Sequence, residues 1–243
     1  MGVSKGCLRG LLLSWVAVAG CAGLTPADLE DLLQGSGVLG DAALDEKTIV
    51  AGLQDALRVG TDRAVRSTSR TDGYFGDPQI RIPLPEQLET IADTLRSVGM
   101  SAQLDELELT MNRAAESAAA EATPVFVDAI TSMSFGDARS ILQGGERAAT
   151  DYFEASTRSK LSERFAPIVD ASMREVGVFQ LYDQVARRIA LLPFVDSAQL
   201  DLRAFVTEGA LDGLFSVLAR EEARIREDPS ARTTDLLRRV FGR

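Results

Sequence analysis

One carboxylate in this sequence has surroundings that acid–base chemistry would need. Glu116 ends the stretch Asn112-Arg113-Ala114-Ala115-Glu116, on a segment whose apolar residues recur at helical spacing, so its side chain is expected to face the interior. A buried carboxyl either pairs with a cation, such as Arg113, or stays protonated and can act as an acid. The pair is the favoured interpretation, and Glu116 is the candidate catalytic acid under the other.

Three arginines near the C-terminus are the candidates for binding a ligand. Arg220, Arg224 and Arg226 lie within two helical turns, so their guanidinium groups can converge on an anion. In the same run Glu222 precedes Arg226 by four residues, the favourable order for an ion pair on a helix, which is the alternative interpretation. Aromatic residues that a pocket beside them would use, although more often part of a core, are Tyr152, Phe153 and Phe215.

The third candidate is Cys21, which ends the stretch Val18-Ala19-Gly20-Cys21. Two positive charges, Lys5 and Arg9, precede the apolar segment 11–19, which has the layout of a secretory signal peptide and is too short to span a bilayer. The stretch resembles the bacterial lipobox, in which the cysteine receives a diacylglyceryl group and becomes the first residue after cleavage. The resemblance implies lipidation of Cys21. The alternative is an N-terminal helix of the fold with an unmodified thiol.

A lipid on Cys21 would hold the protein at a bacterial membrane, facing the periplasm. Ala22 follows the cysteine, in place of the aspartate that some bacteria use for retention in the inner membrane, so we expect the outer membrane rather than the inner. Residues 1–20 are then a signal peptide, residues 21–45 a lipidated N-terminus and glycine-containing flexible tether, and residues 46–243 one helical domain.

The composition excludes several kinds of chemistry. The 243 residues include no histidine, and both cysteines, Cys7 and Cys21, precede the body. The body therefore has no histidine- or cysteine-based catalytic group and no zinc site built on those ligands. Because the formal net charge is −10 and bases alternate with acids, nucleic acid is not an expected partner. We expect no metal and no cofactor: Asp72 and Asp77 flank a Gly-Tyr-Phe-Gly turn, but the rest of a calcium loop is missing.

Apolar periodicity predicts an all-α fold, a single domain of many helices. We expect helices that begin at Glu46 and Thr123, a capped helix from Ser134 to Gly144, and helices over residues 86–98, 101–122, 146–159, 161–176, 178–192, 201–227 and 234–241. The expected N-terminal caps are Asp45, Ser101, and Ser134 with Asp137; Gly99 is an expected C-terminal cap. The alanines between residues 114 and 122 predict close approach of neighbouring helices.

One segment breaks the helical pattern. Residues 71–85 contain two glycines and three prolines, and from Gln79 to Leu84 apolar side chains alternate with others. This predicts an extended segment that places Ile80, Ile82 and Leu84 on the helical body. The sequence offers no partner strand, so a sheet is not expected.

Several motifs of the body occur in a distinctive combination: Leu84-Pro85 after Ile80-Arg81-Ile82-Pro83, Asn112-Arg113-Ala114-Ala115-Glu116, Asp137-Ala138 with Ile141-Leu142 and Gly144, Ala149-Thr150 with Tyr152-Phe153, and Glu221-Glu222 followed by Ile225-Arg226 and Asp228-Pro229. In this combination the chain resembles the bacterial domain-of-unknown-function 4197 family over about residues 45–242. The resemblance implies a helical protein, often behind an export signal, and assigns no activity to any residue.

We therefore expect a cell-envelope lipoprotein whose body is a non-catalytic binding or scaffold module. Its expected partners are the membrane, through Cys21, and an envelope protein or peptidoglycan. One alternative is an enzyme that cleaves peptidoglycan with a single carboxylic acid, because Glu116-Ser117 resembles the Glu-Ser pair of lytic transglycosylases, although their accompanying motifs are missing. Another is a protein that binds a small anionic ligand between its helices.

Overall fold

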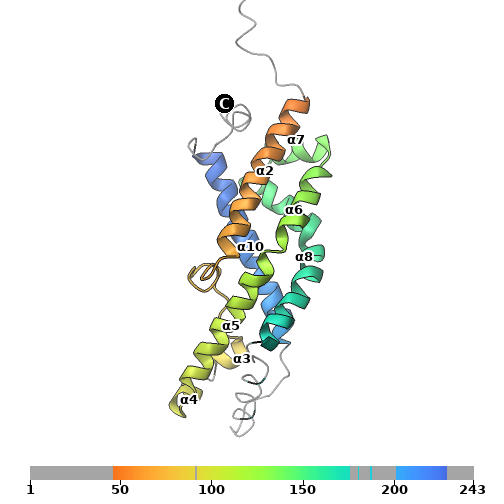
Figure 1. Cartoon of the computed structure of the whole chain (residues 1–243). Coiled ribbons are helices and arrows are strands. Elements are labelled where there is room, and N and C mark those ends of the chain that lie inside the picture. Colours follow the sequence, from red (N-terminus) through yellow and green to blue (C-terminus); the bar gives the residue numbers. More distant parts are fainter. Residues whose placement is uncertain (1–45, 91, 176–179, 181–186, 188–200, 229–243) are drawn as a thin grey trace, which may run out of the picture. The chain divides into compact units, whose positions relative to one another are not determined.

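The computed structural model describes residues 46–90, 92–175, 180, 187 and 201–228. These residues form helices and connecting segments with no β-strand, which confirms the all-α prediction. Figure 1 shows the helices, whose bounds are α2 (Glu46–Thr68), α3 (Glu86–Glu89), α4 (Ala92–Ser97), α5 (Ser101–Ala119), α6 (Ala122–Thr131), α7 (Phe135–Gln143), α8 (Ala148–Glu175) and α10 (Leu202–Glu227).

Several sequence predictions fall outside the described residues. They are the signal peptide, Cys21, the tether, the Asp45 cap, the helix over residues 234–241, and all but two positions of the helix over residues 178–192. Among the helices that are described, none is both long enough and apolar enough to cross a membrane.

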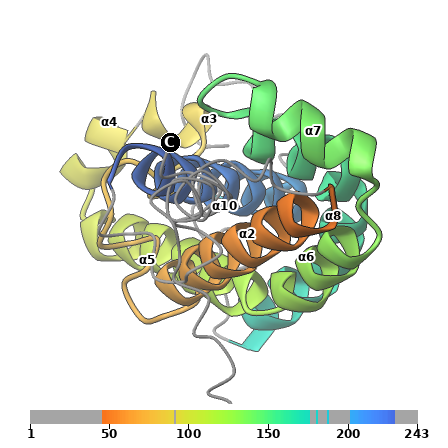
Figure 2. The same ribbon diagram turned by 90° about the horizontal axis from the view of Figure 1, so that it is seen from above.

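Helix α10 lies at the centre of the body, as Figure 2 shows. It packs against α2, α5 and α8. Helices α2 and α10 run antiparallel, because Ala56 contacts Ile225 whereas Arg63, later in α2, pairs with Glu221, earlier in α10. A helix packed against three others is expected to be apolar over a wide face, and the buried residues of α10 indeed cover such a face on every turn, while Glu208 and Asp212 on the remaining face are exposed.

The aromatic core lies between α6, α8 and α10. The ring of Phe126 meets the rings of Phe153 and Phe215 edge-on, with centroids 5.3 and 6.3 Å apart. All three side chains are buried, so Phe153 and Phe215 belong to the core and do not line a pocket beside the C-terminal arginines. Close approach of α5 to its neighbours is also present, since Ala114, Ala115 and Ala118 are fully buried.

The segment predicted to be extended lies on α10 and is buried in the predicted alternation, but only its second part is extended: residues 78–80 form a turn, and residues 81–84 belong to neither a helix nor a turn. Ile80, Ile82 and Leu84 are buried, while Arg81 and Pro83 are exposed. Two glycines of α10 make room for this part of the chain. A Cβ atom at Gly209 would approach the Ile82 side chain to 3.1 Å, and one at Gly213 would approach Tyr74 Cε1 to 2.4 Å.

Backbone N–H groups of the extended segment have partners outside any sheet. The N–H of Gln79 donates to the Asp77 carboxylate (3.0 Å), and those of Ile80 and Arg81 donate to the Asp77 carbonyl. The N–H of Ile82 donates to Asn112 Oδ1 at 2.9 Å, and Asn112 Nδ2 donates back to the Ile82 carbonyl at 2.8 Å. Asp77 and the buried Asn112 amide thus satisfy backbone groups for which the sequence provides no partner strand.

The local caps and helix breaks are partly as predicted. Ser134 and Asp137 form a capping box, and Gly99 has the positive φ of 87° typical of a C-terminal glycine. The predicted cap at Ser101 is wrong: Met100 occupies the N-cap position of α5, without a side-chain hydrogen bond, and Ser101 is already helical.

One predicted helix boundary is also wrong, and another is described only in part. The helix expected over residues 86–98 is described as α3 and α4: Thr90 follows α3 as a turn residue, and residue 91 lies outside the described residues. The helices expected over 146–159 and 161–176 are one helix, α8. Buried residues continue at helical spacing through Phe153, Thr157 and Leu161, so the polar residues 158–160 are an exposed turn of one helix rather than a break.

Candidate functional site

Glu116, a residue of helix α5, holds the turn around Tyr74 by hydrogen bonds. Its Oε1 accepts the N–H groups of Tyr74 (3.1 Å) and Phe75 (3.3 Å), and its Oε2 lies 2.7 Å from Arg113 Nη1. Arg113 also donates to Asp72 at 2.7 Å, so the same pair of side chains holds both ends of the turn. The ion pair that the sequence favoured for Glu116 is therefore present.

This geometry favours a structural role for Glu116 over a catalytic one. A general acid must present a proton within hydrogen-bond reach of its substrate. The Glu116 side chain is only 5% exposed, and both of its oxygens already accept hydrogen bonds from N–H groups. It lines neither the pocket beside Glu222 nor the grooves at Phe205 and at Tyr152.

Tyr74, at the centre of the same turn, is fully buried between α5 and α10. Its hydroxyl donates to the carbonyl of Ala210 at 2.5 Å. Burial raises the pKa of the Tyr74 phenol well above its usual range, and the nearby negative charges of Glu116 and Asp212 raise it further. The folded protein therefore holds this phenol in its neutral form.

We expect the stability of the protein to fall in alkali because of Tyr74. An unfolded tyrosine ionises near pH 10, whereas the folded one keeps its proton, so the stabilisation is fully present below about pH 10 and is lost above it. The expected loss is up to about 1.4 kcal/mol per pH unit. Urea unfolding followed by circular dichroism from pH 9 to 11 should show this slope in the native protein. In Tyr74→Phe the slope should be smaller, and equal slopes would contradict the assignment.

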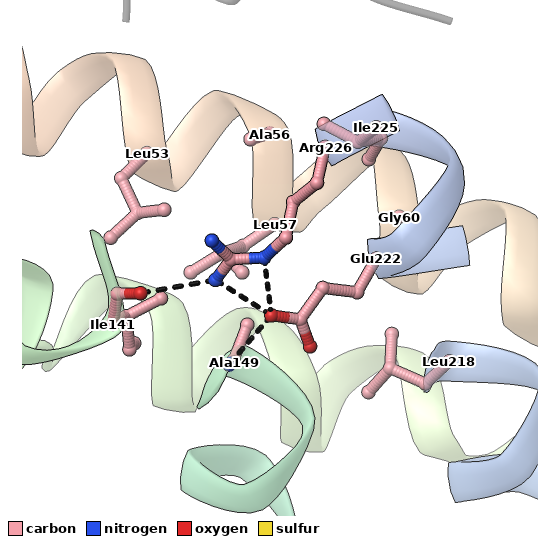
Figure 3. A pocket seen from close by; sticks show the side chains of 10 residues that line it. All are labelled: Leu53, Ala56, Leu57, Gly60, Ile141, Ala149, Leu218, Glu222, Ile225 and Arg226. Carbon is pink, nitrogen blue, oxygen red and sulfur yellow. Dashed lines mark hydrogen bonds and ion pairs between the residues drawn. The ribbon is translucent and has the colours of Figure 1, made fainter. Parts of the chain in front are cut away.

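Glu222 is the second buried carboxylate, and Figure 3 shows it beside a small pocket. Its Oε1 accepts the Ala149 N–H (3.0 Å), and its Oε2 accepts both the N–H and the hydroxyl of Thr150 (2.8 Å each). Arg226 pairs with it at 2.8 Å and also donates to the Ile141 carbonyl, which joins α7 to this group. Glu222 thus caps α8 from another helix.

Helix α8 needs this distant cap because its own sequence lacks one. The first N–H groups of a helix have no intrahelical partner, and the residue before α8 is Arg147 rather than a serine, threonine or aspartate. A carboxylate at this end also meets the positive end of the helix dipole. The four-residue spacing in the sequence predicts only an ion pair of Glu222 with Arg226 and does not predict this role.

The pocket in Figure 3 is mostly apolar and small. Leucine, isoleucine, alanine and glycine residues of α2, α7, α8 and α10 line it, with Glu222 and Arg226 at its polar end. The space inside it, about 30 Å³, holds one water-sized group but not a typical small-molecule ligand.

The three candidate arginines do not converge. Arg220 pairs with Asp77 at 2.6 Å and donates to Gln79, Arg224 lies 3.2 Å from Glu221, and Arg226 is engaged by Glu222. The hydrogen bond from Arg220 holds the pKa of the Asp77 carboxyl below its usual value. Each guanidinium group therefore has a separate acidic partner, and an anion site that combines them stays a prediction.

A larger groove, of about 810 Å³, lies between the extended segment and the first half of α10. Pro83 and Phe205 contribute apolar surface, and Glu208 and Asp212 contribute negative charge. Arg158 of α8 spans both acids, with distances of 2.7 and 2.6 Å. Within the described part of the chain, no group of three or more potential ligands is placed to hold a metal ion.

A family model described as "Protein of unknown function (DUF4197)" matches residues 43–242. The chain belongs to the DUF4197 family. Comparisons with curated proteins and with solved structures found no match.

Three buried polar residues of this DUF4197 chain share one structural role. The side chains of Asn112, Glu116 and Glu222 each extend from a helix and accept hydrogen bonds from backbone N–H groups of another part of the chain. The partners are separated by 30 to 73 residues in the sequence. All three belong to the motifs that indicated the family. These motifs therefore contain the residues that attach the non-helical segment around Tyr74 and Ile82, and the first turn of α8, to the rest of the helices. They indicate no activity.

Proposed function

We propose that this DUF4197 protein is a non-catalytic binding or scaffold module of the bacterial cell envelope. In this proposal a lipid on Cys21 anchors the chain in a membrane, the outer rather than the inner one, and the helical body faces the periplasm. Its partner is an envelope protein or peptidoglycan. The basic, apolar and small-residue order of the first 21 residues supports the anchor.

The observation that carries the non-catalytic role is the state of Glu116. This is the carboxylate that a single-acid mechanism would use, and it is buried, paired with Arg113, and occupied by two backbone N–H groups. Releasing it for proton transfer would detach the turn at Tyr74 from α5. Because its buried charges are engaged in internal hydrogen bonds and ion pairs, the body is better suited to binding a partner through its surface than to catalysis.

The anchor is tested by the intact mass of the protein extracted from membranes of a bacterial host. We expect the mass of residues 21–243 plus a diacylglyceryl group and an acyl group. The variant Cys21→Ser should keep its full length and carry no lipid mass, while Cys7→Ser should have the same mass as the native protein, because Cys7 precedes the expected cleavage site. An unprocessed mass with a free Cys21 thiol would overturn the envelope location.

The absence of catalysis is tested separately with purified peptidoglycan sacculi. We expect no release of soluble fragments by the native protein. Release that disappears in Glu116→Gln, while circular dichroism shows the variant folded, would replace the binding role with a single-carboxylate hydrolytic or lytic mechanism.

A further inference from the structure

A groove of about 370 Å³ lies between α6 and α8, which pack against each other in both views of the bundle (Figures 1 and 2). Its volume is in the lower part of the range of small-molecule sites, about 300–1,000 Å³. None of the three C-terminal arginines lines it, so this groove is separate from the predicted anion site.

Two serines and two threonines line the groove, and each of their hydroxyls donates its proton to a carbonyl of its own helix. The Ser132 hydroxyl donates to the Asp128 carbonyl (2.8 Å) and that of Ser156 to the Tyr152 carbonyl (2.7 Å). Thr131 and Thr157 make the same type of bond. Because a hydroxyl has one proton and two lone pairs, the three exposed groups, those of Thr131, Ser132 and Ser156, present acceptors to the groove, while Thr157 is buried. A matching ligand is rich in O–H or N–H donors.

The charges in the groove balance each other. Lys160 Nζ lies 2.8 Å from Asp128 Oδ2, and the hydrogen bond from Lys160 lowers the pKa of that carboxyl. These two are the charged side chains of the lining, so the lining carries one positive and one negative charge. An anion would have to displace Asp128 from Lys160, and a cation would have to displace Lys160 from Asp128. The pair leaves a neutral ligand as the best match, and offers it both donors and an acceptor.

Apolar surface lies beside these polar groups. Tyr152 is half-buried, and its ring is held edge-on to Phe153 with centroids 5.7 Å apart. Val125 and Ala129 of α6 also line the groove and are buried. An aromatic ring fixed next to hydroxyl acceptors suits a molecule with one apolar face and a polar rim.

We propose that the groove between α6 and α8 binds a neutral saccharide. The C–H face of a sugar ring packs on Tyr152, sugar hydroxyls donate to Ser132 and Ser156, and the Lys160–Asp128 pair exchanges hydrogen bonds with the rim of the ring. The inference rests on the proposed function only for the source of the ligand, the glycans of the cell envelope. Binding itself does not depend on the lipid anchor.

The experiment is saturation-transfer NMR on the full-length protein in a detergent without a sugar headgroup. The probes are N-acetylglucosamine trimer and maltotriose, both neutral, and inorganic phosphate is added as a competitor. We expect signal transfer to at least one saccharide, a dissociation constant on the order of 1 mM, and no competition by phosphate.

Two variants and a matched control test the location. Ser156→Phe fills the groove from an exposed position, and Lys160→Met removes one charge of the pair; each should weaken binding at least tenfold. Ser117→Phe should bind like the native protein, because Ser117 is an exposed serine of α5 with the same hydrogen bond to the fourth preceding carbonyl. Circular dichroism confirms that each variant is folded.

The proposal is overturned if neither saccharide shows transfer, if all three variants bind equally, or if phosphate displaces the saccharide. The last result would identify an anion site at Lys160. Each of these three results leaves the mass of the lipidated chain unchanged, so it is distinguishable from failure of the envelope anchor.

Discussion

Replacing Glu222 with alanine is expected to lower the free energy of unfolding by about 3–5 kcal/mol. The carboxylate side chain is 7% exposed and is bound by Arg226 and by three donors of Ala149 and Thr150. Without it, a guanidinium group and two N–H groups at the start of α8 lose their acceptor in a place that water reaches poorly. Urea unfolding followed by circular dichroism measures the change.

Two comparisons separate the cap from a general effect of the mutation. Glu222→Gln keeps the shape but turns an NH₂ group toward N–H donors, so an intermediate loss of about 1–3 kcal/mol is expected. Glu163→Ala removes an exposed carboxylate from the middle of α8 and should change stability by no more than about 0.5 kcal/mol. If the Glu222 and Glu163 variants unfold at the same urea concentration, the capping role of Glu222 is wrong.

Gly213→Ala is expected to destabilise the protein by about 1–3 kcal/mol, although the same change usually stabilises a helix by about 0.5–1 kcal/mol. The new Cβ would lie 2.4 Å from Cε1 of Tyr74 and 3.2 Å from the Cβ of Ile80. Tyr74 cannot swing away without losing its bond to the Ala210 carbonyl and entering the packed core. Either the turn or α10 must shift.

Gly60 of α2 provides the matched control. It is also a buried helical glycine, but a Cβ there would meet the nearest atom, Ile225 Cδ1, at an ordinary 3.5 Å. Gly60→Ala should therefore stabilise the protein by about 0.5–1 kcal/mol and fill part of the pocket in Figure 3. Thermal melts of the two variants should shift in opposite directions, and a shared upward shift would contradict the packing of Tyr74 on α10.

The predictions that were correct rest on local information. The Ser134–Asp137 cap joins residues three apart, Gly99 needs only its own backbone angle, and the alternation from Ile80 to Leu84 is a pattern of neighbours. The helical periodicity was sufficient for the fold class. At residues 158–160 three consecutive polar residues suggested the end of a helix. The buried residues on either side, Thr157 and Leu161, keep the helical spacing, so the helix continues.

The attachments at Asn112 and Glu222 could not be predicted in the same way. Their partners are 30 and 72 or more residues away, and the pairing depends on how the helices pack. A usable signal was the absence of a local cap before α8, together with Glu222 at a position of α10 that the apolar pattern places inside. Tyr152 shows the same limit: it was grouped with the C-terminal arginines, but the structure places it between α6 and α8.

The hydrogen bonds of the extended segment also bear on self-association. An isolated extended segment usually offers free N–H groups, on which another chain can add a strand and begin an aggregate. Here each N–H from Gln79 to Ile82 already has an acceptor, and Pro83 has none to offer. An incoming strand would meet carbonyl groups without their complementary donors. Asp77 and Asn112 together thereby keep this segment from acting as a template for intermolecular β-pairing, a useful property for any helical protein that is kept at high local concentration.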